Sequence, residues 1–189
     1  EGDIYKIAPK QKRTRDDRET KFYKNSQRKR REIIKSALRE IEEGKPVLIG
    51  TVSEKEIKAL KDHLKHQTKD SQTKVRILEY TAASESIFQR DKEKLKATAF
   101  KKKYGVDKDT YATYESLIKN ESGKENTITL GTSILGRGTT IKTSDKVNDA
   151  GGIHVIVDGI HETSFRNPIQ YLSRTSRGDN NGSTQIFFS

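Results

Sequence analysis

Short apolar runs typical of buried strands recur along the chain from residue 47 onward, and stretches with helical spacing separate them. The first run is followed by Ser53 and Glu56, a capping-box pattern, and then by a predicted helix with Ile57, Leu60 and Leu64 on one face. The five predicted strands are 47–52, 75–80, 127–130, 153–157 and 185–188. Strands separated by helices pair in parallel through right-handed crossovers, so the pattern predicts an open α/β sheet with helices on both faces.

The region before the first strand divides into an arm and a helix. Residues 1–21 are predicted to be an N-terminal arm and linker, in which apolar residues near the start pair with a neighbouring element and residues 9–20 are almost entirely polar. Apolar residues then recur at helical spacing, which predicts a helix over 22–43. Gly44 and Pro46 follow where a helix ends. We therefore expect a main domain over 22–189.

Residues 81–126 are longer than one crossover needs. They are predicted to form a helical insertion of two or three helices within the domain, with apolar surface from Tyr104, Tyr111, Tyr114, Leu117 and Ile118.

Composition narrows the function classes. The net charge is +11, and the excess lies in the first two thirds of the chain. The absence of cysteine excludes disulfides, thiolate zinc sites and a cysteine nucleophile. No apolar run reaches the roughly 20 residues of a membrane span. The chain has no methionine, even at position 1, so we expect it to be a piece of a larger protein.

Two segments carry candidate chemistry. The first, 132–141, follows the third strand and contains Gly136-Arg137-Gly138-Thr139. Ligands of open α/β sheets bind beyond the carboxyl ends of the strands, and glycines there allow close backbone approach. A glycine pair of this kind is equally typical of an ordinary turn.

The second segment, 167–178, is predicted to be a short helix that begins with Asn167 and Pro168 and ends at Gly178. Gln170, Arg174 and Arg177 share one of its faces. Two arginines on one face favour an anion such as phosphate, which their guanidinium groups bind through paired hydrogen bonds. The alternative is a solvated basic face.

Taken in order, these motifs resemble a known family. The Gly136–Thr139 loop, Gly152-Ile153-His154-Val155-Ile156, His161-Glu162 and the 170–179 segment resemble the second nucleotide-binding domain of SecA, the ATPase motor of bacterial protein export. The resemblance covers 44–80 and 127–189, and it is poor over 81–126.

The resemblance implies a RecA-like domain that closes on a first nucleotide-binding domain around ATP and Mg²⁺. Gly136, Arg137, Gly138 and Thr139 would form the motif-five loop, and Gln170, Arg174 and Arg177 would form motif six. Arg177 would be the arginine finger, with Arg174 beside it. The implied partners are the first domain, a polypeptide substrate and a membrane translocon, and the implied location is cytoplasmic or peripheral to a membrane.

Three departures from the family pattern stand out. Thr140 replaces an Asp, and Ser173 and Ser176 replace glycines of motif six. The chain also lacks the phosphate-binding G-x-x-x-x-G-K-[ST] loop, so we expect no useful ATP hydrolysis by this chain alone.

Two other functions remain open at this point: half of a superfamily-two nucleic-acid helicase, and a SecA-like interaction domain without turnover. The basic runs 28–31 and 101–103 have acidic neighbours and no aromatic ladder, which favours solvated helix faces over nucleic-acid binding. His154, in an apolar strand, is predicted to be a core histidine. His161-Glu162 lacks the second histidine of a zinc helix, so no metal site is predicted.

Overall fold

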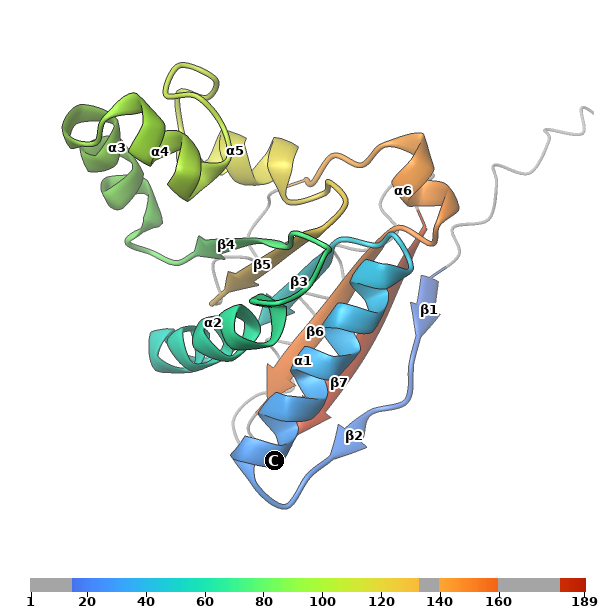
Figure 1. Cartoon of the computed structure of the whole chain (residues 1–189). Helices are drawn as coiled ribbons and strands as arrows, with labels where there is room; N and C mark the ends of the chain where they lie inside the picture. Colours follow the sequence, from blue (N-terminus) through green and yellow to red (C-terminus); the bar gives the residue numbers. More distant parts are fainter. Residues whose placement is uncertain (1–14, 133–139, 160–180) are drawn as a thin grey trace, which may run out of the picture.

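The computed structural model describes residues 15–132, 140–159 and 181–189. In these ranges the strands form one sheet in the order β1-β7-β6-β3-β5-β4, with β2 also pairing with β7, and every pairing is parallel (Figure 1). The strands are β1 (Arg15–Asp17), β2 (Lys21–Phe22), β3 (Val47–Gly50), β4 (Arg76–Tyr80), β5 (Thr127–Gly131), β6 (Ile153–Gly159) and β7 (Gly182–Phe188). The predicted parallel α/β sheet is confirmed.

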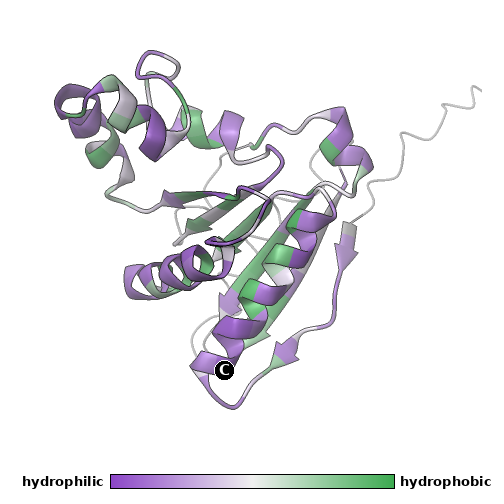
Figure 2. Cartoon of the chain, viewed as in Figure 1, coloured by the Kyte–Doolittle hydropathy of each residue, from purple (hydrophilic) through white to green (hydrophobic). Residues whose placement is uncertain are grey.

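Helices cover both faces of the sheet, as predicted. The helices are α1 (Ser26–Glu42), α2 (Glu54–Thr68), α3 (Ser84–Lys94), α4 (Ala97–Tyr104), α5 (Tyr114–Glu121) and α6 (Asp145–Asp149). One buried cluster joins α1 and α2 to Val47 and Ile49 of β3, and the other joins α3–α5 to Leu48 between them. Successive residues of β3 therefore face opposite helical layers. Figure 2 shows the same division, with apolar strands and polar outer faces on α1 and α2.

Residues 81–126 form three helices, within the predicted number. Their core is an aromatic cluster in which the rings of Phe88, Phe100, Tyr104 and Tyr114 lie 4.6–6.0 Å apart between centroids. The Tyr114 hydroxyl donates a hydrogen bond to the Glu79 carbonyl of β4. This contact joins the three helices to the edge of the sheet.

The N-terminal region differs from the prediction. Residues 15–17 and 21–22 pair with β7, although the sequence placed them in a linker and at the start of a helix. The helix begins only at Ser26, where the Asn25 side chain accepts a hydrogen bond from the Arg28 amide. Phe22 instead stacks on Phe188, with ring centroids 5.6 Å apart. Backbone pairing with an edge strand requires no apolar pattern, which explains the difference.

Within the ranges that the structure describes, no helix is both long enough and apolar enough to cross a bilayer.

Candidate functional site

The central strands end side by side at the carboxyl edge of the sheet. β3 lies between β5 and β6, and the register aligns Gly50 with Gly131 on one side and with Val157 on the other. The segments 133–139 and 160–180 follow the ends of β5 and β6 directly in sequence. Two strand spacings of about 4.8 Å separate β5 from β6, so the aligned residues Gly131 and Val157 lie roughly 10 Å apart.

The predicted site residues belong to these two segments. They lie outside the described residues, so their positions stay predictions: Gly136, Arg137, Gly138, Thr139, Gln170, Arg174 and Arg177. Ser173, Ser176, His161 and Glu162 also lie outside the described residues. Thr140 is described and is exposed.

A buried ion pair lies at this edge. Lys29 of α1 places its Nζ 2.8 Å from Asp158 Oδ1, and the two side chains are only 4% and 3% exposed. The same ammonium group donates a hydrogen bond of 3.0 Å to the Gly159 carbonyl. Thr51 Oγ1 donates to Asp158 Oδ2 at 3.0 Å. The cluster therefore joins the start of α1, the residue after β3 and the last residues of β6.

Burial raises the pKa of Asp158, while Lys29 and Thr51 favour its charged form. The ammonium group lies within ion-pair distance of one oxygen of the carboxylate, and Thr51 donates to the other. A buried charge left without its partner is strongly unfavourable, so Lys29 and Asp158 hold each other in place.

The start of α2 is fixed by similar contacts. Ser53 caps the helix by accepting a hydrogen bond from the Glu56 amide at 3.2 Å, as the capping-box pattern predicted. The Glu56 carboxylate in turn pairs with Arg30 of α1 at 2.9 Å. Val52, between Thr51 and Ser53, is 47% exposed at the carboxyl edge. The connection after β3 is thus fixed by Thr51 before Val52 and by Ser53 after it, while the Val52 side chain remains accessible.

The described part of the carboxyl edge does not offer ligands for Mg²⁺. The Asp158 carboxylate is occupied by Lys29 and Thr51, and the Glu56 carboxylate pairs with Arg30. No group of three or more acidic or histidine side chains that could hold a metal occurs in residues 15–132, 140–159 and 181–189. The described residues therefore do not fit a metal, and no metal contact is assigned to them.

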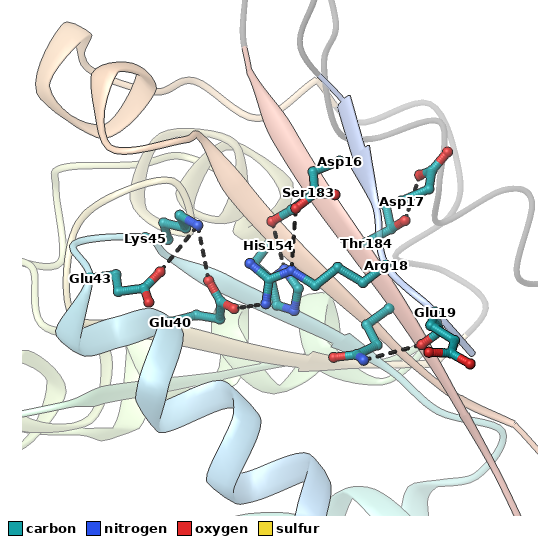
Figure 3. A network of polar contacts seen from close by, with 11 residues as sticks. Asp16, Asp17, Arg18, Glu19, Glu40, Glu43, Lys45, His154, Ser183 and Thr184 are labelled. Carbon is teal, nitrogen blue, oxygen red and sulfur yellow. Dashed lines mark hydrogen bonds and ion pairs between the residues drawn. The ribbon is translucent and has the colours of Figure 1, made fainter. Parts of the chain in front are cut away.

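A second polar cluster lies at the opposite, amino edge of the sheet (Figure 3). Glu40, near the end of α1, accepts a hydrogen bond from Arg18 and pairs with Lys45 at 3.1 Å. Burial alone would raise the pKa of Glu40, but the hydrogen bonds from Arg18 and Lys45 hold it below its ordinary value. His154 Nδ1 lies 2.6 Å from Ser183 Oγ. Burial lowers the pKa of His154 to about 4, so the ring is neutral at pH 7.

The position of His154 in the core is confirmed, since its side chain is fully buried. Its Nε2 has no hydrogen-bond partner in the part of the chain that the structure describes.

The basic run 28–31 departs from the predicted solvated face. Lys29 is buried against Asp158 and Arg30 pairs with Glu56, whereas Arg28 and Arg31 are exposed.

Sequence reasoning missed the Lys29–Asp158 pair. One signal was present, because Asp158 is a lone carboxylate at the carboxyl end of an apolar strand. Nothing local identified Lys29 among its basic neighbours as the residue that reaches it.

Comparison with known families decides the classification. The family model described as "SecA P-loop domain" matches residues 12–148, most of the chain. This chain belongs to the SecA P-loop domain family. The family resemblance predicted from the motifs is confirmed.

Individual SecA relatives align over nearly the whole chain. The protein translocase subunit SecA of Porphyromonas gingivalis strain W83 is 29% identical over 99% of this chain, which covers 14% of that relative. The subunit of the same name from Amoebophilus asiaticus strain 5a2 is 30% identical over 93% of this chain, which covers 13% of it. The SecA-family chain thus spans a small part of the length of these relatives.

A solved structure shares the fold. Mss116p DEAD-box helicase domain 2, bound to an RNA duplex, superimposes with a TM-score of 0.52 at 18% sequence identity. The alignment covers 92% of this SecA-family chain and 53% of the helicase chain. The parallel sheet between two helical layers is therefore a RecA-like fold.

Proposed function

We propose that this chain is the second motor domain of a SecA-like ATPase and contributes motif five and an arginine finger to an ATP site shared with a first nucleotide-binding domain. The observation that carries the proposal is topological. In sequence, both candidate segments follow strands that flank β3, and these strands end at the carboxyl edge, where ligands of open α/β sheets bind. The family membership supports the same site.

Each part of the site has a proposed role. Gly136, Arg137, Gly138 and Thr139 form a loop whose backbone approaches the nucleotide closely. Gln170 and Arg174 orient the phosphate groups, and Arg177 stabilises the charge that develops during phosphoryl transfer. The phosphate-binding loop and the ligands of Mg²⁺ come from the first domain, because this chain has no such loop.

The proposed partners follow from the SecA relatives, which are named translocase subunits. They are the first nucleotide-binding domain of the same protein, a polypeptide substrate and a membrane translocon. The proposed location is the cytoplasm or the surface of a membrane. Nucleic acid is not a proposed ligand.

The test compares the isolated chain with the protein in which it is joined to a first nucleotide-binding domain. We expect no measurable ATP hydrolysis by the isolated chain. In the joined protein, Arg177→Ala should lower kcat about 10³-fold or more, with a much smaller change in KM for ATP.

Arg90→Ala is the matched control, since this arginine lies on α3 and its side chain is 58% exposed. Its kcat should stay close to that of the unchanged protein. Turnover by the isolated chain that Arg177→Ala abolishes, or equal effects of the two variants in the joined protein, would contradict the proposal.

A second candidate is a SecA-like interaction domain without turnover. Thr140 and Ser173 favour it, because the family has Asp and Gly at these positions. Absence of nucleotide binding by the joined protein would support this candidate over the motor domain.

A further inference from the structure

An open groove lies between α1 and α2, the two helices that cover one face of the sheet. Its volume is about 450 Å³. Ile34 and Leu38 of α1 contribute its apolar residues; Ile34 is buried and Leu38 is half-buried. On the α2 side it is lined by His63 and Gln67.

Arg31, Lys35 and Arg39 also line the groove from α1. They occupy successive turns of the helix, about 6 Å apart along its axis, so each cation has another cation as its neighbour one turn away. All three side chains are exposed, and among the described residues no carboxylate lies within ion-pair distance of any of them. By contrast, Lys29 and Arg30 of the same helix are both paired.

The cations of α1 lie close enough to His63 of α2 to act on its charge. Burial is the main cause that lowers the pKa of His63, and the nearby Arg30, His66 and Arg31 lower it further. Glu42 is the acidic residue in the lining, and it lies at the end of the row of cations. A row of cations beside an apolar floor is complementary to a ligand with acidic residues next to apolar ones.

We propose that the α1–α2 groove binds an acidic amphipathic helix of a partner protein. A leucine-like side chain of the partner would contact Leu38 above the buried Ile34, and carboxylates one turn apart would pair with Arg31, Lys35 and Arg39. This occupant fits better than nucleic acid, because the groove combines an apolar floor with a lining that has no Phe, Tyr or Trp in the described chain.

The test measures fluorescence anisotropy of a labelled helical peptide of about 15 residues with the 189-residue chain. The peptide has leucines at positions i, i+4 and i+7 and glutamates beside them. A second peptide has the same composition, scrambled so that the leucines no longer share a face. We expect the amphipathic peptide to bind more tightly than the scrambled one, with affinity that falls as salt increases.

Three variants separate the effects of the groove cations, the net charge and the apolar contact on peptide binding. Lys35→Glu/Arg39→Glu should weaken binding of the amphipathic peptide about tenfold or more. Lys94→Glu/Lys102→Glu changes the net charge equally on exposed lysines of α3 and α4 and should leave Kd within about twofold. Leu38→Ser should weaken binding of the amphipathic peptide several-fold and should change binding of the scrambled peptide little. Thermal unfolding followed by circular dichroism verifies that each variant is folded.

Several results would overturn the proposal: equal binding of the two peptides, equal losses for the two charge-reversal variants, or no effect of Leu38→Ser. Tighter binding of a single-stranded oligonucleotide, lost in Lys35→Glu/Arg39→Glu, would assign the groove to nucleic acid instead.

Discussion

Replacing Lys29 by methionine removes the cation of the buried pair and leaves the Asp158 carboxylate in the interior. The two charged groups lie 2.8 Å apart. At an effective dielectric constant of about 20, unit charges at this distance attract by about 6 kcal/mol. Part of this attraction offsets the desolvation of both groups. We therefore expect Lys29→Met to lower the free energy of unfolding at pH 7 by about 3–5 kcal/mol, the usual cost of removing one partner of a buried pair.

The stability lost in Lys29→Met should depend on pH. Burial already raises the pKa of Asp158, and loss of the ammonium group raises it further. A carboxyl group with a raised pKa binds its proton more tightly in the folded state. Stability therefore decreases as pH rises from the unfolded pKa through the folded one. The deficit of Lys29→Met should thus be smallest near about pH 4 and grow toward neutral pH.

Urea unfolding followed by circular dichroism at several pH values measures both effects. Lys35→Met is the matched control, because Lys35 is exposed on the same helix, and it should change stability by about 0.5 kcal/mol or less. Lys29→Met/Asp158→Asn should recover much of the loss, since no unpaired charge remains and the amide oxygen still accepts from Thr51. A cost of Lys29→Met below about 1 kcal/mol, or strictly additive single variants, would refute the ion-pair reasoning.

Two further predictions concern other parts of the fold. Glu40→Gln should lower stability at pH 7 by about 1–3 kcal/mol. Because the pKa of Glu40 is lowered, its contribution is present above the unfolded pKa and lost as pH falls through the folded one, so the variant should lose less stability in acid, as measured by urea unfolding. Gly152→Ala should cost about 3 kcal/mol or more, because φ is +77° and the new Cβ would lie 1.8 Å from the Asn181 carbonyl oxygen. Gly44→Ala, with φ of +86° and 3.6 Å to the nearest atom, should cost only about 1 kcal/mol, and equal melting temperatures for the two glycine variants would contradict this difference.

The central strands were predictable because they are buried on both faces. A strand with helices above and below has no polar side, so β3 and β6 stand out as continuous apolar runs. The helices behind them were predictable from capping residues and spacing, as at Ser53. The strand at Arg15–Asp17 left no such signal, because it is polar and pairs through its backbone at the edge of the sheet.

In the candidate site, too, some residues were predictable from the sequence and others were not. The glycine loop and the arginine pair were found because their order along the chain resembles a family, and their positions stay predictions. The Lys29–Asp158 pair was missed because its partners lie far apart in sequence. Burial of one lysine within a run of four basic residues depends on tertiary contacts that local spacing does not encode.

Helix α1 makes buried polar contacts near both of its ends, at opposite edges of the sheet. Lys29 contacts the last residues of β6, and eleven residues later Glu40 lies in the cluster around His154, near the first residues of that strand. The helical span of about 16 Å roughly matches the four-residue strand span of about 13 Å. A one-residue slip of α1 would break both contacts together. The two contacts therefore fix the position of α1 along β6 at both ends of the strand, and through Glu40 they also connect the helix to Arg18 beside the N-terminal strands.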